Sequence, residues 1–180
     1  MTSRVSRRTV AAGLASGAVL TASCAAAQGR GRVGDPVTGP QSGLRVEPLE
    51  IVTASGVRRF QVEVADTDRT REVGMMFRRS LPWTRGMLFD FEVPQPNAAF
   101  WMRNTLIPLD ILYIRPDGRI LSIARSATPR SEVPIPSGGG PILGVLELAG
   151  GAADRFGIQP GDQVRHRIFR RTARPATSRR

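Results

Sequence analysis

The sequence predicts a single α+β domain dominated by a curved antiparallel sheet, with one main helix and one short helix. Three observations lead to this fold class. Apolar and polar residues alternate with period two in several segments, which is typical of strands with one buried face. Turn-forming Gly, Pro and Asp residues separate these segments. Helical spacing is confined to two short stretches, and strands and helices do not alternate repeatedly as they do in parallel α/β folds.

Residues 44–53 and 59–65 predict the first hairpin, because apolar and polar residues alternate in both and a Ser-Gly pair lies between them. Residues 66–79, DTDRTREVGMMFRR, change to the spacing of an amphipathic helix with capping residues at its start. Gly74 inside this segment costs about 1 kcal/mol relative to Ala. We therefore expect another segment to approach the chain closely at Gly74.

The second half of the chain predicts mainly strands. Residues 115–119, RPDGR, form the turn of a hairpin, because Pro fixes the first corner and Gly accepts a positive φ. Residues 128–141 form a long Pro- and Gly-rich loop, which is typical of either disorder or a binding site. Strands are expected at 86–93, 97–105, 109–114, 120–123, 141–151 and 161–169, and a short helix at 152–156.

Residues 1–27 predict an export signal. A basic start precedes an uncharged apolar run at 10–22, which is too short to span a bilayer as a helix. The segment SRRTV at 6–10 resembles the twin-arginine export motif. Cleavage is expected after Ala27, and a lipoprotein cut before Cys24 is the alternative. We expect a periplasmic or secreted protein without a transmembrane segment once the signal is removed.

The charge is unevenly distributed along the chain. The formal net charge is +11, yet residues 44–164 contain 14 Arg and 14 Asp plus Glu. The excess therefore lies in the two ends, which we interpret as the signal, a flexible linker at 28–43 and a basic disordered tail at 169–180, around a domain at 44–168. A charge-balanced domain argues against nucleic acid as the main partner.

Composition excludes several classes of enzyme. All 26 basic residues are Arg, so no lysine Schiff base or lysine general base is available. Cys24 is the only cysteine and His166 the only histidine, which leaves too few residues for Cys/His zinc sites or for Ser-His-Asp and Cys-His catalysis. We expect no cofactor, no metal and a monomer, with His166 as a surface strand residue.

Four motifs together resemble one known family. REVGMMFRRSLP, GMLFDF, FWMRNTLIPLDILYI and LELAGGAADRFGIQPGD occur in this order within residues 44–168. The chain resembles the uncharacterised secreted bacterial and archaeal family called domain of unknown function 192. The resemblance implies a small, partly barrel-like α+β domain and assigns no activity. Arg103 stands where similar members have Lys, which keeps the charge and adds a planar fork.

Polar residues interrupt the most apolar segments of the chain. Asp110 points where its apolar neighbours point, and Glu147 lies between two leucines; buried carboxylates need donors or must stay neutral. Asp110 is either a structural acceptor, satisfied by backbone N–H groups or an Arg such as Arg78, or part of a site. Glu147 is either paired with an Arg on the neighbouring strand or part of a site. We predict a shallow ligand pocket lined by Met75, Arg78, Trp101, Arg103, Asn104, Asp110 and Glu147.

Three functions remain open from the sequence. We favour a non-enzymatic cell-envelope domain that binds a small ligand, glycan or peptide, because a Trp face beside polar forks is how such ligands are held. The first alternative is a hydrolase in which Asp110 and Glu147 form an acid/base pair, with carboxyl groups about 5 to 10 Å apart. The second is a structural or accessory protein.

Overall fold

The structure, a computed structural model, describes residues 32–170. The predicted signal peptide at 1–27, the first residues of the linker and the end of the basic tail lie outside the described residues. None of the helices in the described part is long and apolar enough to span a membrane.

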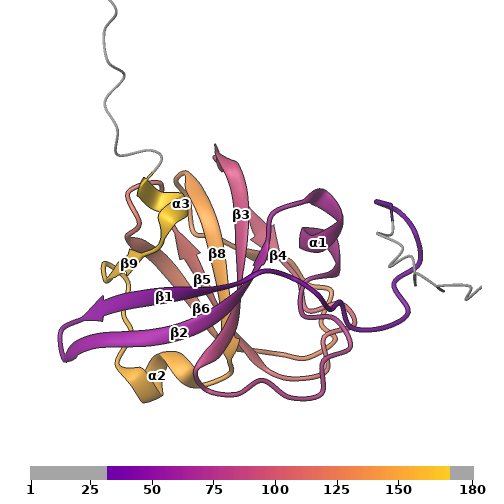
Figure 1. Ribbon diagram of the computed structural model, residues 1–180, viewed down its shortest axis with the longest axis horizontal. Coiled ribbons are helices and arrows are strands. Elements are labelled where there is room, and N and C mark those ends of the chain that lie inside the picture. The colour runs from indigo at the N-terminus through magenta and orange to yellow at the C-terminus, as the bar shows by residue number, and fades with distance from the viewer. Residues whose placement is uncertain (1–31, 171–180) are drawn as a thin grey trace, which may run out of the picture. The chain divides into compact units, whose positions relative to one another are not determined.

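The described chain contains nine strands and three short helices (Figure 1). In chain order they are β1 (Val46–Thr53), β2 (Gly56–Ala65), α1 (Asp68–Val73), β3 (Arg85–Gln95), β4 (Ala99–Phe100), β5 (Leu109–Ile114), β6 (Ile120–Ala127), β7 (Ile135–Pro136), β8 (Ile142–Ala149), α2 (Ala152–Phe156), β9 (Gln163–Arg165) and α3 (Arg167–Arg170).

Seven strands form one sheet in the order β6-β5-β8-β3-β2-β1-β9, while β4 and β7 form a separate pair. All neighbours in the sheet are antiparallel except β2 and β3, which are parallel. Helix α1 lies in the connection between these two strands, as parallel neighbours require a crossover. The predicted α+β class is confirmed, and the sheet is mixed at this one pair.

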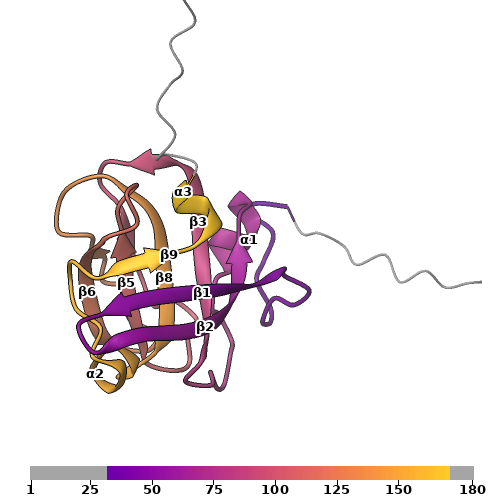
Figure 2. The same ribbon diagram turned by 60° about the vertical axis from the view of Figure 1, so that its left-hand side comes forward.

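The sheet curls so that its two ends meet. The β1–β2 hairpin crosses in front of β5 and β6 (Figures 1 and 2). The turn before β6 then bonds to the segment that leads into β9: Ile120 N–H donates to the carbonyl of Asp162 at 2.9 Å, and Val164 N–H to that of Gly118 at 2.8 Å. Gly118 has a φ of 82°, and a Cβ there would lie 2.5 Å from Gln163 Nε2. The partly barrel-like shape is therefore confirmed.

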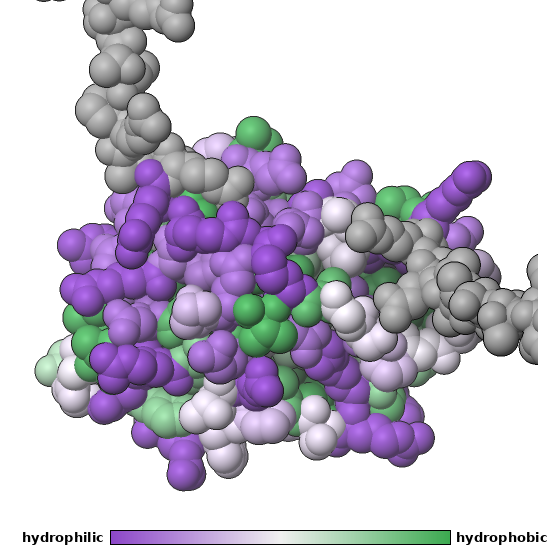
Figure 3. All heavy atoms as spheres, viewed as in Figure 1, coloured by the Kyte–Doolittle hydropathy of each residue, from purple (hydrophilic) through white to green (hydrophobic). Residues whose placement is uncertain are grey.

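The central strands are buried on both faces. One apolar cluster fills the inside of the curl and includes Leu49, Val62 and Leu146. A second cluster covers the other face of β3, β5 and β8 and includes Met87 and Phe89. All six residues of β5 are buried for this reason. The face shown in Figure 3 is mostly hydrophilic, with small separate apolar groups.

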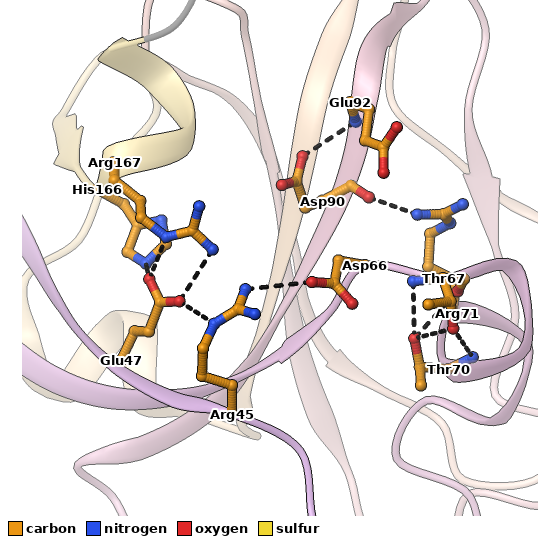
Figure 4. A network of polar contacts seen from close by, with 10 residues as sticks. All are labelled: Arg45, Glu47, Asp66, Thr67, Thr70, Arg71, Asp90, Glu92, His166 and Arg167. Carbon is orange, nitrogen blue, oxygen red and sulfur yellow. Dashed lines mark hydrogen bonds and ion pairs between the residues drawn. The ribbon is translucent and has the colours of Figure 1, made fainter. Parts of the chain in front are cut away.

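A polar network joins β1 to α3 and to the segment between β2 and α1 (Figure 4). Glu47 accepts hydrogen bonds from Arg167 at 2.7 and 2.9 Å and from Arg45, and these bonds, first among them those from Arg167, lower the pKa of Glu47 to about 2. Arg45 also donates to Asp66 at 3.1 Å. His166 is buried, with Nε2 3.0 Å from Glu47 Oε2, so its prediction as a surface residue was wrong.

Two further details differ from the sequence-based expectations. The predicted strand at 97–105 contains only the two residues of β4, which pair with β7 and not with the seven-stranded sheet, and the chain after them packs on the outer face of that sheet. The last predicted strand ends at Arg165 and is followed by α3, whose Ile168 and Phe169 are buried in the inner cluster. Residue 169 therefore belongs to the packed domain and not to a tail. The first hairpin and the hairpin at 115–119 are confirmed.

Candidate functional site

Helix α1 forms one wall of a pocket on the outer face of the sheet. The helix begins with a capping box, in which Thr70 N–H donates to Thr67 Oγ1 at 3.2 Å and Thr67 N–H donates to Thr70 Oγ1 at 3.0 Å. It ends at Gly74, which has a φ of 48°. A Cβ at Gly74 would lie 3.2 Å from the ring of Phe89, so the close approach predicted from the sequence is confirmed.

Aromatic side chains form the opposite wall. Phe100 makes edge-to-face contacts with Phe89, Phe91 and Tyr113, with ring centroids 5.0, 6.3 and 6.0 Å apart. The hydroxyl of Tyr113 donates to the carbonyl of Ile135 at 2.5 Å, and burial raises the pKa of Tyr113 to about 12. These contacts hold the β4–β7 pair over the sheet.

The two walls enclose a cavity of about 590 Å³. Most of its surface is apolar, while charged side chains stand at the mouth and one carboxyl lies inside. The lining residues are Asp68, Arg71, Glu72, Val73, Gly74, Met75, Met76, Phe89, Phe91, Gln95, Asn97, Ala98, Ala99, Phe100, Trp101, Arg103, Thr105, Pro134 and Glu147.

Glu147 is the buried carboxyl of the pocket. In the register of β8 it lies opposite Met87 of β3 and Ile111 of β5, so all three side chains point to the outer face of the sheet. Glu147 is 4% exposed, and its Oε2 has no hydrogen-bond partner among residues 32–170. Burial raises the pKa of Glu147 to about 8, and the charge of Arg78 opposes this shift.

Arg78 does not neutralise Glu147 directly. Its guanidinium binds Glu63 through two hydrogen bonds, Nη1 to Oε1 at 2.8 Å and Nη2 to Oε2 at 2.5 Å. Nη2 also donates to the carbonyl of Gln41 at 3.3 Å. Arg78 is not part of the pocket lining, and the predicted pairing of Glu147 with an Arg of a neighbouring strand is not seen among the described residues.

Asp110 lies on the other face of the sheet and has a structural role. It is fully buried and accepts three backbone hydrogen bonds, from Ser126 at 2.7 Å, Gly151 at 3.0 Å and Ala153 at 2.7 Å. These bonds join β5 to β6 and to the start of α2. Of the two roles left open by the sequence, acceptance from backbone N–H groups is the one observed, so Asp110 does not line the pocket.

Four of the seven predicted site residues line the pocket. Met75 is buried in its wall, and Trp101 stands at its edge with 49% of its surface exposed. Arg103 also lines it, with its guanidinium carbon 5.7 Å from the centre of the Trp101 ring. Asn104 is outside the lining: it has a φ of 55°, and its side-chain amide contacts the sulfur of Met76 at 3.8 Å.

Sequence reasoning missed the aromatic wall and the charged mouth. Phe89 and Phe91 are two residues apart in β3, so the sequence predicts that their side chains share one face of the strand. It does not predict which segment of the chain covers that face. Arg71 donates to the carbonyl of Asp90 at 2.6 Å and also contacts Asp68 at 2.6 Å, so it fixes α1 beside β3 (Figure 4 shows the bond to Asp90). The loop at 128–141 contributes Pro134 to the lining.

The fold and the pocket define a small α+β domain with a curled, mixed sheet and an external cavity under its main helix. The chain belongs to the domain of unknown function 192 family, described as an uncharacterised ACR, whose sequence profile matches residues 50–166. The resemblance seen in the sequence motifs is thereby confirmed. No match is found among curated proteins.

Two solved structures are similar to this chain over most of its described part. A protein from Sinorhizobium meliloti 1021, described as a candidate transcription regulator, is 40% identical with a TM-score of 0.66, covering 69% of this chain and 96% of its own. A protein of unknown function from Novosphingobium aromaticivorans DSM 12444 is 42% identical with a TM-score of 0.67, covering 74% and 94%.

Asp110→Asn tests the structural role of this carboxylate. The substitution places an NH₂ donor against backbone N–H donors, so we expect the free energy of unfolding to fall by about 2–4 kcal/mol. Urea denaturation measures it. The control is Asp154→Asn, because the side chain of Asp154 is 70% exposed and pairs with Arg125 at the surface, where a change below about 1 kcal/mol is expected. Equal stability of Asp110→Asn and the wild type would contradict the role.

Glu147→Gln tests the burial of the pocket carboxyl. With its pKa raised from an ordinary value near 4.5 to about 8, Glu147 contributes stability that is fully present below pH 4.5 and is lost as pH rises to about 8. We expect the variant to remove this loss, which is up to about 1.4 kcal/mol per pH unit. Urea denaturation across this pH range measures it. Exposed Glu132→Gln should keep the wild-type slope, and an unchanged slope in Glu147→Gln would disprove the assignment.

Proposed function

We propose that this protein is an exported cell-envelope domain that binds a small ligand in the pocket between α1 and the aromatic wall. The observation that carries the proposal is Glu147, a buried carboxyl that lines a cavity of about 590 Å³ and whose Oε2 has no hydrogen-bond partner in the described part of the chain. A volume of this size with apolar walls and few polar groups is typical of small-molecule sites. The half-exposed Trp101 and the guanidinium of Arg103 give the mouth a flat face and hydrogen-bond donors.

Binding is favoured over hydrolysis because the two carboxyls proposed as a catalytic pair are separated by the sheet. Asp110 lies opposite Leu148 in the β5–β8 register, whereas Glu147 lies opposite Ile111, so their side chains point to opposite faces. Asp110 is also bonded to three backbone N–H groups. An acid/base pair acting on one glycosidic bond requires both carboxyls in one cleft.

The description of the Sinorhizobium protein as a candidate transcription regulator does not change this proposal. Reading of the DNA major groove commonly uses an α-helix. Within residues 32–170 the longest helix has six residues, Asp68 to Val73, and it is part of the pocket wall. A small-ligand site is therefore better supported by the described part of the chain than a DNA-reading surface.

Ala99→Trp tests the pocket as a binding site. Ala99 is exposed and lines the cavity, so a large ring there would fill the cavity without removing core contacts. We expect an envelope ligand from a panel of amino acids, dipeptides and muropeptide sugars to raise the melting temperature of the wild type but not of Ala99→Trp. The control is Ala54→Trp, in the exposed β1–β2 turn, which should respond like the wild type. An identical response of both variants, or none from the wild type, would contradict the site; the latter would favour an accessory protein.

Export can be tested independently of binding. The predicted signal requires the Arg pair at positions 7 and 8, so we expect the double substitution Arg7→Lys and Arg8→Lys to retain the precursor inside the cell. Cell fractionation followed by N-terminal sequencing measures both the location and the cleavage site. A wild-type chain that stays in the cytoplasm and begins at Met1 would refute export.

A further inference from the structure

The pocket contains more information on its ligand than its size alone. We infer that the ligand carries a primary ammonium group on a slender apolar chain, with the ammonium donating to Glu147 and the chain lying between Phe89, Phe100 and the methionines of the α1 wall. This inference rests on the proposed function, because it names the chemistry of the same site.

The first argument is the need of Glu147 for a donor. Among the described residues its buried Oε2 has no hydrogen-bond partner, and Arg78, whose charge acts on Glu147, makes two hydrogen bonds to Glu63. A ligand ammonium supplies N–H donors to the orphaned oxygen, and its positive charge stabilises the ionised form of Glu147 that burial disfavours. An anionic ligand group at this depth would disfavour that ionised form further.

The second argument is the chemistry of the side chains that line the cavity. The ring centroid of Phe100 lies 5.0 Å from that of Phe89 and 6.3 Å from that of Phe91, and all three rings line the same cavity as Glu147. Aromatic faces attract organic cations within about 6 Å, by about 0.5–2 kcal/mol depending on desolvation. The sulfur-containing side chains of Met75 and Met76 are polarizable and adapt to an alkyl chain. Aromatic rings around one carboxylate are therefore suited to an ammonium on an apolar chain.

The third argument is the contrast between the inside and the mouth of the pocket. Arg103 stands at the mouth with 52% of its side chain exposed, stacked on Trp101 and 4.0 Å from Glu132. Arg71 at the same mouth is bound to Asp68 and to the carbonyl of Asp90. The exposed guanidinium of Arg103 favours a ligand with an acceptor at its outer end, such as the peptide carbonyl of a lysine residue, over a second ammonium.

A matched set of probes tests the ligand class: 1-aminopentane, 1-pentanol and pentanoate. Titration followed by the amide NMR shifts of the mature domain gives the dissociation constants. We expect the amine to bind the wild type about tenfold or more tightly than the alcohol, because only the amine can make a charge-assisted hydrogen bond to Glu147. Pentanoate should bind weakest, because it lacks this bond and is itself negatively charged. Glu147→Gln should remove the advantage of the amine and leave the binding of the alcohol nearly unchanged.

Asp68→Asn provides the matched control. Asp68 also lines the pocket, but its side chain is 80% exposed at the mouth. If the buried carboxyl is the ammonium partner, Asp68→Asn should change the affinity for 1-aminopentane by less than about threefold. An equal loss in Asp68→Asn and Glu147→Gln would show that the amine responds to the general charge of the mouth, and it would overturn the inference.

Two further probes distinguish the sources of such an ammonium. Nα-acetyl-lysine-N-methylamide presents peptide carbonyls at its outer end, and 1,5-diaminopentane presents a second ammonium. Because Arg103 stands at the mouth, we expect the lysine derivative to bind more tightly. Tighter binding of the diamine would overturn a peptide as the source.

The outcomes separate failure of this inference from failure of the proposed function. If 1-pentanol binds the wild type as tightly as the amine, and Ala99→Trp blocks both, the pocket is a ligand site and the ammonium inference is wrong. If none of the probes and none of the envelope ligands of the panel shifts the resonances of the pocket residues, both fail.

Discussion

The three backbone hydrogen bonds accepted by Asp110 are the interaction on which the arrangement of the sheet depends. They join β5, the irregularity in β6 at Ser126 and the beginning of α2 at one buried carboxylate. Ser126 has a φ of 45°, and the strand pairing shifts between Leu109 and Ile111, so the local geometry of β6 directs an N–H group at Asp110. The bonds thereby connect β5 to its neighbour β6 and to α2, the helix that follows β8.

Register then decides the different roles of two carboxyls on neighbouring strands. Asp110 and Glu147 occupy positions offset by one residue across the β5–β8 pair, so one points into the curl and the other to the outer face. Inside the curl, backbone N–H groups meet the charge of Asp110. On the outer face, apolar side chains surround Glu147, and burial raises its pKa to about 8. The same residue chemistry therefore gives a structural support in one case and a candidate binding group in the other.

Most of the fold could be predicted because its signals are local. Alternation of apolar residues identified the strands of both hairpins, and the Pro-Asp-Gly turn fixed one of them. The close approach expected at Gly74 is present, but its predicted place inside a helix was wrong, because α1 ends at Val73 and Gly74 is the C-cap with a positive φ. The parallel β2–β3 pair and helix α3 were not predicted, because pairing direction and docking of the last turn depend on contacts between distant segments. The length of β4 was predicted as nine residues instead of two, because apolar content alone does not distinguish a strand from a buried loop.

For the candidate site, the sequence by itself determined which chemistry is present: buried carboxyls among apolar residues, a Trp beside an Arg, several methionines and a single histidine. It also determined family membership through its ordered motifs. Only the tertiary structure decided that Met75, Trp101, Arg103 and Glu147 share a cavity while Arg78, Asn104 and Asp110 do not line it. The physical reason is that strand register decides to which face of the sheet a side chain points, and long-range packing decides which residues it contacts. Neither can be read from the residue spacing within one segment.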